Sequence, residues 1–136
     1  MNYTSWRRLF PKFLSNPPAD SAALQRLEEA KLPLPSDYIE FLSEINGGEG
    51  WVDDVYLVIW KAEELINLNA AYSVSTFVPN FFLFGSNGGD DALAFCYAQS
   101  EVSVVRVPFI GMESKNAIKL ADSFEQFIEI LPNLDL

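Results

Sequence analysis

The clearest pattern in the chain lies between Ser36 and Ile45, where apolar residues recur every three or four positions. That spacing places them on one face of a helix, with acidic residues on the opposite face. The apolar positions are Tyr38, Phe41, Leu42 and Ile45. We expect the helix to stop at Asn46-Gly47-Gly48, because these residues tolerate the left-handed backbone that ends many helices.

Two further helices are predicted on either side of this one. The first covers about Ala19 to Ala30 and is broken by Leu32-Pro33-Leu34-Pro35, since proline lacks an N–H and disfavours helix before it. The second covers Lys61 to about Tyr72 and is followed by a loop to Asn80. Residues 1–16 show no clear period, so 1–19 are a possible N-terminal arm.

A closing helix is predicted after Asp122, whose spacing to Glu125 fits a capping box. Apolar residues again share one face, and Pro132 ends the pattern. They are Phe124, Phe127, Ile128 and Leu131.

Runs rich in β-branched and aromatic residues predict strands in the second half of the chain. They are Val55–Trp60, Phe81–Phe84, Ala92–Tyr97, Val102–Val107 and 117–120. Sequential strands favour an antiparallel sheet. We therefore expect one α+β domain over 1–136, a mostly antiparallel sheet carrying an N-terminal helix pair, a short middle helix and a C-terminal helix.

The charge of the chain restricts its partners. Nineteen acidic and nine basic residues give a net charge of −10, which disfavours nucleic acid because binding to phosphates depends on Lys and Arg. The segment from Ser36 to Glu64 contains eight acidic residues and one basic residue, Lys61. This segment is either a solvated face or a docking surface for a basic protein. In the second case the electrostatic field of the acidic residues would accelerate the approach of that protein.

Several kinds of chemistry are disfavoured by the residue types present. The chain has no histidine and one cysteine, Cys96, which removes histidine-dependent nucleophiles and Cys/His zinc sites. The pairs Asp53-Asp54 and Asp90-Asp91 lack a recognisable metal-ligand spacing. The stretch Gly85 to Gly89 is better explained as a turn than as a phosphate loop, because two acids follow it. We expect no catalysis, cofactor or metal, and, with no apolar run long enough to span a membrane, a cytoplasmic location.

Four aromatic residues occur beside polar sequence: Trp51, Tyr56, Trp60 and Tyr72. If exposed, they would suit a protein-binding hot spot. In a chain with eleven phenylalanines, aromatic residues are more often part of the core.

Four sequence motifs, taken in their order along the chain, resemble the SMI1/KNR4, or SUKH, superfamily over about Asp20 to Leu131. The first joins Leu27-Glu28-Glu29 to Leu34-Pro35-Ser36-Asp37-Tyr38-Ile39-Glu40-Phe41-Leu42 and Asn46-Gly47-Gly48. The others are Val58-Ile59-Trp60-Lys61-Ala62-Glu63-Glu64-Leu65, Phe84-Gly85-Ser86-Asn87-Gly88-Gly89-Asp90 and the segment from Ala121 to Leu131.

The resemblance implies an α+β domain that binds proteins. Bacterial members of the superfamily are widely immunity proteins that neutralise toxins, many of them nucleases, and fungal relatives are interaction proteins. We therefore expect a basic toxin domain as partner. The alternative is a regulatory or scaffold role with a housekeeping partner, and a less favoured one is an enzyme that depends on carboxylates alone. The predicted interface acids are Glu49, Asp53, Asp54, Glu63 and Glu64, with Asp90 and Asp91 as a second patch. The predicted turn residues are Asn46, Gly47, Gly48, Gly85, Gly88 and Gly89.

Overall fold

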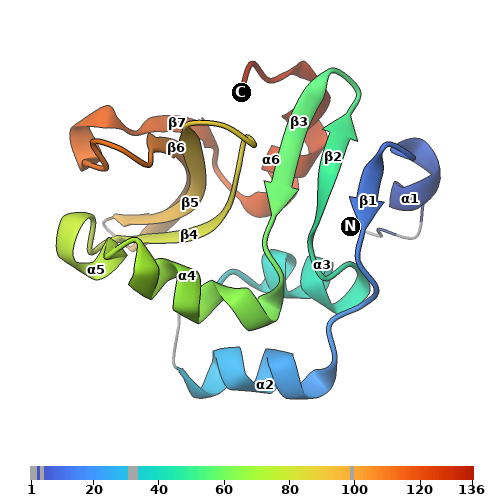
Figure 1. The fold of residues 1–136 in the computed structure, drawn as a ribbon, viewed down its shortest axis with the longest axis horizontal. Coiled ribbons are helices and arrows are strands. Elements are labelled where there is room, and N and C mark those ends of the chain that lie inside the picture. Colours follow the sequence, from blue (N-terminus) through green and yellow to red (C-terminus); the bar gives the residue numbers. More distant parts are fainter. Residues whose placement is uncertain (1–2, 4, 31–33, 99) are drawn as a thin grey trace.

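A computed structural model describes the chain from Tyr3 to Leu136, apart from residues 4, 31–33 and 99. Seven antiparallel strands form one sheet in chain order, so that each strand pairs with its neighbours in sequence (Figure 1). They are β1 (Phe13–Ser15), β2 (Gly48–Val52), β3 (Val55–Ile59), β4 (Phe81–Ser86), β5 (Asp91–Ala98), β6 (Glu101–Pro108) and β7 (Ile118–Ala121). The predicted α+β class with a mostly antiparallel sheet is confirmed.

Helices precede, interrupt and follow the strands. The α-helices are α1 (Trp6–Leu9), α2 (Ser21–Glu29), α3 (Ser36–Glu44), α4 (Leu65–Ala71), α5 (Val74–Phe77) and α6 (Phe124–Ile130). Single 3₁₀ turns occur at η1 (Ala62–Glu64), η2 (Ser114–Asn116) and η3 (Leu131–Asn133). The N-terminal pair, the middle helix and the C-terminal helix lie where the sequence predicts them. The Leu32-Pro33 part of the predicted helix break lies outside the described residues.

The segment without a clear period contributes α1 and β1. Two local predictions are wrong. The predicted loop after Tyr72 contains α5. The last helix is capped by Ser123, whose hydroxyl accepts from the Gln126 N–H, and not by Asp122. Asp122 instead donates its own N–H to the Gln126 side chain.

The end of α3 also differs from expectation. Ile45 follows the helix in an extended conformation, and the left-handed residue Gly47 (φ 73°) comes two positions later. The helix therefore ends without a left-handed cap. Gly47 serves a different purpose, since any Cβ there would clash with the Ile59 and Trp60 carbonyls where the chain turns into β2.

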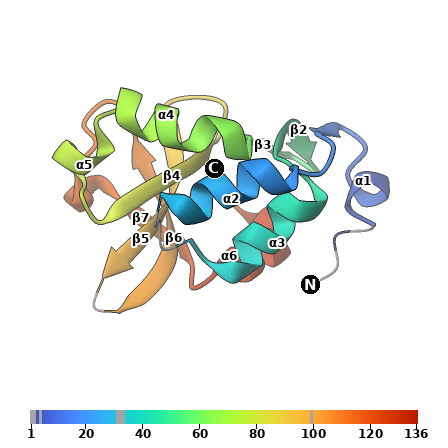
Figure 2. The same ribbon diagram turned by 90° about the horizontal axis from the view of Figure 1, so that it is seen from below.

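Strands β4 to β6 are covered on both faces. Phe82 and Phe84 point to a core shared with α3 and α6, whereas Phe81 and Leu83 point to a second core closed by Val74, Val78 and Met112. Figure 2 shows α3 and α6 on one side of these strands and α4 and α5 on the other. This double coverage explains why the strands are apolar almost throughout.

The sheet opens where β3 meets β4. Only Val58↔Ser86 and Ile59↔Gly85 pair across this join. Beyond it, the free edge of β4 is satisfied by the Asn69 side chain of α4, which accepts from the Leu83 N–H (2.8 Å) and donates to the Leu83 carbonyl (3.0 Å). The strands β1 to β3 consequently stand apart from β4 to β7, as Figure 1 shows.

Strands β1 to β3 bury one face and expose the other. Phe13, Val52 and Leu57 point into the core, while the residues between them point outward. Burial on only one side produces this alternation, because successive side chains of a strand point to opposite faces. Among the described residues, no helix is long and apolar enough to cross a membrane.

Candidate functional site

The outward residues of β1 to β3 form a surface that we call the outer face: Leu14, Glu49, Trp51, Tyr56 and Val58. Leu14, Glu49 and Val58 are direct neighbours across the three strands, and Trp51 opposes Tyr56 in the next row. Leu14 is 74% exposed and Trp51 is 47% exposed. Large apolar side chains grouped in this way at a surface indicate an interaction site.

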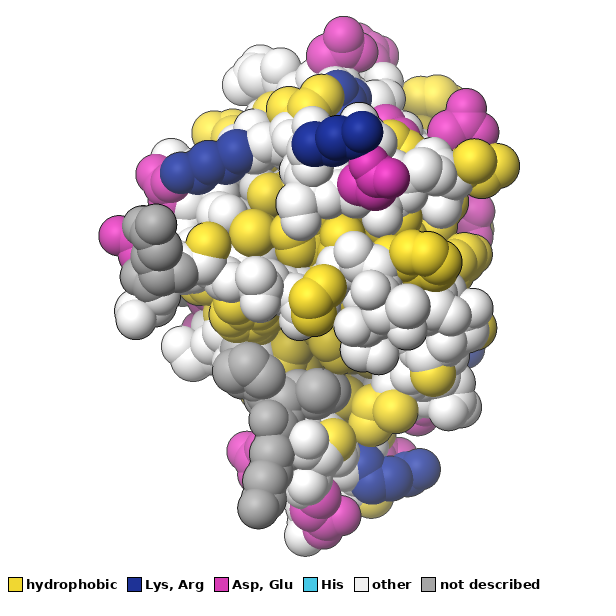
Figure 3. Space-filling model, turned by 90° about the vertical axis from the view of Figure 1, so that its left-hand side faces the viewer, with side chains coloured by type: hydrophobic (Ala, Val, Ile, Leu, Met, Phe, Trp, Pro, Cys, Tyr) yellow, Lys and Arg dark blue, Asp and Glu magenta, His cyan; other side chains and the backbone are white. Residues whose placement is uncertain are grey.

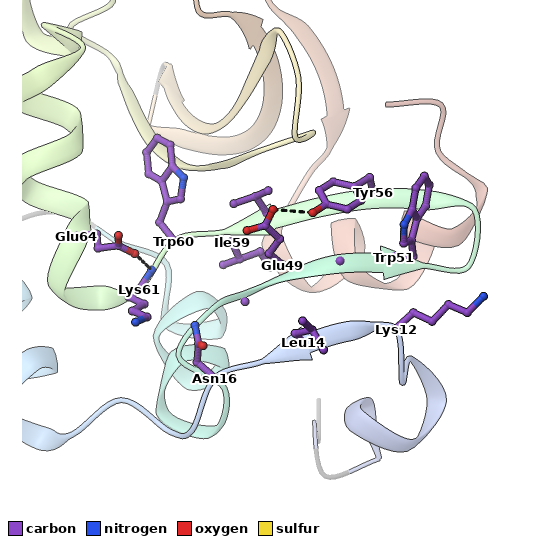
Figure 4. Close-up of a pocket in the computed structure, with 13 residues that line it drawn as sticks. Lys12, Leu14, Asn16, Glu49, Trp51, Tyr56, Ile59, Trp60, Lys61 and Glu64 are labelled. Carbon is purple, nitrogen blue, oxygen red and sulfur yellow. Dashed lines mark hydrogen bonds between the residues drawn. The ribbon is translucent and has the colours of Figure 1, made fainter.

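The outer face lines a hollow of about 650 Å³ (Figure 4). At one end the hollow is bounded by Trp60, Lys61 and Glu64, which follow β3, and at the other by Lys12. It is a broad, open depression suited to the surface of another protein.

One corner of the outer face is held in place by a hydrogen bond. The Tyr56 hydroxyl donates to Glu49 Oε2 at 2.6 Å. The same hydrogen bond raises the pKa of the tyrosine, because ionising the phenol beside a carboxylate is unfavourable. The Trp51 and Tyr56 rings meet edge to face with centroids 5.2 Å apart.

The turn between β4 and β5 supports this corner from the side. Gly88 (φ 80°) lies against the Tyr56 ring, and a Cβ at this position would overlap the ring. Glycine is thus required here both for its backbone conformation and for close approach. The contact with Gly88 holds the Tyr56 side chain in the position from which its hydroxyl donates to Glu49.

The predicted interface acids are divided among several places. Glu49 lies on the outer face, and Glu64 lies at the end of the hollow, where its carboxylate accepts from the Lys61 N–H. Glu63 accepts from the Asn46 amide at 2.9 Å. Of these three, only Glu49 projects from the centre of the exposed surface.

Asp53 and Asp54 form the two-residue turn between β2 and β3 and are exposed. Asp53 has a left-handed backbone (φ 54°), which aspartate tolerates better than most residues. Both line a second hollow with Lys12 and Trp51, so they form a rim beside the outer face.

Asp90 ends the turn between β4 and β5, Asp91 begins β5, and neither lines the hollow that Asp53 and Asp54 share. Asp91 forms an ion pair with Arg106 at 3.5 Å, and the Asp90 carbonyl accepts from the Phe109 N–H. The structure therefore does not join the second predicted patch to Asp53 and Asp54.

The sequence of the chain matches a known family. The model of the SMI1 / KNR4 family (SUKH-1) matches residues 18–130. The chain belongs to the SMI1/KNR4 (SUKH-1) family. No curated protein is similar enough in sequence to be matched to the chain.

The motifs of this SUKH-1 chain have structural roles that the sequence shows only in part. Gly48 lies in β2 and Gly85 in β4, so neither is a turn residue, while Gly88 and Gly89 do lie in the turn before β5. Gly85 is required for close approach, because a Cβ there would clash with the Val58 carbonyl of β3.

Asn46 of the Asn-Gly-Gly motif is buried and links three segments of the chain. Its side-chain oxygen accepts from the Ala62 N–H (2.8 Å), its amide donates to Glu63, and its carbonyl accepts from the Asn16 side chain (3.0 Å). Asn46 thereby joins β1, the end of α3 and η1, which together support one end of the hollow.

Replacing Asn46 with alanine is expected to lower the free energy of unfolding by about 1–3 kcal/mol, because the buried Ala62 N–H loses its acceptor. Urea denaturation followed by circular dichroism measures this change. The exposed Asn133→Ala is the control and is expected to change stability by less than about 0.5 kcal/mol. Equal effects of the two substitutions would contradict the assigned role of Asn46.

Two other exposed apolar regions compete with the outer face. Trp60, Tyr72 and Phe109 form a row of rings beside Phe77 and Ile110, and Figure 3 shows apolar side chains gathered at the α5 end of the molecule. A hollow of about 560 Å³ near α5 is lined by Ile66, Val74 and Phe81, and none of the described residues that line it is charged. The first region includes the carboxylate of Glu113, but that carboxylate is already paired with Lys115 (3.2 Å). Glu49 on the outer face forms no ion pair with a described residue.

The sequence does not mark Leu14 and Val58 as surface residues. A three-residue strand is too short for alternation to be visible, so nothing distinguished Leu14 from a core residue. For Val58, alternation over Val55–Ile59 is hidden because every residue of β3 is apolar. Trp51 and Tyr72 could have been core or surface residues, and the structure shows that both are exposed aromatic residues.

Proposed function

We propose that this SUKH-1 chain is an immunity protein that neutralises a basic toxin by stoichiometric binding through its outer face. The observation that carries the proposal is the uncovered side of β1 to β3, where Trp51, Tyr56 and Glu49 stand together beside an acidic rim. Aromatic residues at the centre of a surface with charge around it are typical of protein-binding hot spots.

Charge favours a basic partner. The chain carries a net charge of −10, and Asp53, Asp54 and Glu64 lie around the outer face. A nuclease toxin presents a basic cleft to nucleic acid, and an acidic protein surface can occupy such a cleft. Opposite charges would accelerate association, and buried aromatic anchors would slow dissociation.

The proposal treats the chain as non-catalytic. It has no histidine, so a reaction near neutral pH would depend on its carboxylates, and the predicted acids are spread over separate parts of the surface. Inhibition by occupancy needs no reacting group. A cytoplasmic location follows from the proposal, because a toxin must be neutralised where it would act.

The experiment that tests the function captures the partner and then assays it. Tagged chain is incubated with native host lysate, washed at low and high salt, and the retained proteins are identified by mass spectrometry. We expect one basic protein in near one-to-one amount that arrests growth when expressed alone and is harmless when expressed with this chain. Retention of housekeeping proteins without any growth arrest would instead support a regulatory or scaffold role.

Reversing the rim charge is expected to slow association with the toxin. The variant Asp53→Asn with Asp54→Lys keeps a residue that tolerates the left-handed backbone at position 53. We expect an association rate lowered by about tenfold in low salt and by much less in 0.5 M salt, because the effect is electrostatic. Stopped-flow fluorescence measures both rates.

The control for this variant is Glu129→Lys on α6, which packs against the core face of the sheet. It changes one exposed acid to a base on a helix that packs against the opposite face of the sheet. If it slows association as much as the rim variant does, net charge and not the rim governs the encounter.

A further inference from the structure

We infer that the corner formed by Glu49, Trp51 and Tyr56 binds an arginine side chain of the partner protein. The inference rests on the proposed function, because it names the chemistry by which the outer face would recognise the toxin. It goes further by assigning one anchor residue type to one place on this surface.

The Glu49 carboxylate is oriented by a hydrogen bond to one of its two oxygens. Tyr56 donates to Oε2, and no described residue donates to Oε1. The tyrosine is protonated at neutral pH, as tyrosines ordinarily are, and the same hydrogen bond raises its pKa further. The corner therefore presents a fixed negative charge whose free oxygen can accept a further hydrogen bond.

The two aromatic rings favour a flat cation. The Trp51 and Tyr56 planes are inclined by 79°, and Trp51 remains nearly half exposed. A guanidinium group is planar and weakly hydrated, so it can stack on an aromatic face while its N–H groups reach a carboxylate. An ammonium group is more strongly hydrated and offers no flat surface, so lysine fits this corner less well.

No cation of the described chain pairs with this carboxylate. Figure 4 shows Lys12 extending beyond Trp51, away from Glu49, and Lys61 at the opposite end of the hollow. The ion pairs of the described residues involve Arg106, Lys115 and Lys119. The charge of Glu49 is consequently available to a group from outside the chain.

The test uses small probes and the intact chain. ¹⁵N-labelled protein is titrated with N-acetyl-arginine methylamide and, separately, with the corresponding citrulline and lysine derivatives. Citrulline keeps the shape of arginine without its charge. We expect saturable shifts of the Trp51 indole N–H and of the Glu49 and Tyr56 amides with the arginine probe, at least about tenfold weaker binding of citrulline, and intermediate binding of lysine.

Two variants make the test specific. Glu49→Gln is expected to abolish saturable binding of the arginine probe while the remaining spectrum shows a folded chain. Glu101→Gln, an exposed carboxylate on β6, is expected to leave the binding unchanged. Equal shifts with citrulline, or binding that survives Glu49→Gln, would overturn the inference.

The outcomes separate this inference from the proposed function. If the arginine probe does not bind at Trp51 but a growth-arresting partner is captured and neutralised, the arginine anchor is wrong and the immunity function stands. If the probe binds at this corner and the captured partner has no toxicity, the arginine site stands and the immunity function is wrong.

Discussion

Replacing Trp51 with alanine is expected to weaken binding of the toxin by about thirtyfold or more. Central tryptophans of protein interfaces commonly contribute at least 2 kcal/mol, which corresponds to a change of this size in the dissociation constant. Trp51 has the largest exposed aromatic area on the outer face and lies beside both Glu49 and the acidic rim. Isothermal titration calorimetry with the captured partner measures the change.

The matched control is Phe77→Ala on α5. Phe77 is 62% exposed, so this substitution also removes a surface ring, but it does so at the other end of the molecule. We expect it to leave affinity within about twofold of the original, because it lies outside the interface. Similar losses from both substitutions would show that binding does not depend on the outer face.

Replacing Phe124 with alanine is expected to lower the free energy of unfolding by about 3–5 kcal/mol. Phe124 is fully buried and its ring lies within 5.2–6.2 Å of Tyr38, Phe41, Phe84, Phe95 and Phe127, measured between centroids. Removal of the ring leaves a cavity at the point where α3, α6 and the sheet meet. Since single domains have a total stability of about 5–15 kcal/mol, the variant should be close to unfolding at 37 °C.

Urea denaturation monitored by circular dichroism measures this loss. Phe77→Ala again supplies the comparison, with an expected change below about 0.5 kcal/mol because its ring is largely in solvent. A loss of less than 1 kcal/mol from Phe124→Ala would show that the aromatic cluster is not the centre of the core.

Much of the architecture could be predicted from sequence, because strands β3 to β7 are rich in residues that favour strands. Strand β2 could not, since Gly48-Glu49-Gly50-Trp51-Val52 contains two glycines and an acid. It becomes a strand through pairing with β1 and β3, and this long-range contact outweighs weak local preference. The same pairing creates the outer face, so a surface that depends on β2 could not be seen in the sequence.

The candidate site was predictable only in composition. The acidic segment between Ser36 and Glu64 was visible, but the fold gives its members different tasks: Glu63 receives a hydrogen bond from Asn46, Asp53 and Asp54 form a turn, and Glu49 faces outward. Charge density along a sequence does not specify which carboxylates converge. The face to which each carboxylate points depends on strand register. A slip of one residue would move every side chain of a strand to the opposite face.

The most direct test of toxin neutralisation through the outer face is a growth assay with the captured partner. The partner is expressed alone and together with the original chain, with Trp51→Ala and with Phe77→Ala, at protein levels matched by immunoblot. We predict growth arrest by the partner alone, recovery with the original chain and with Phe77→Ala, and continued arrest with Trp51→Ala. Full recovery with Trp51→Ala would contradict binding through the outer face, and absence of arrest by the partner alone would contradict the immunity function.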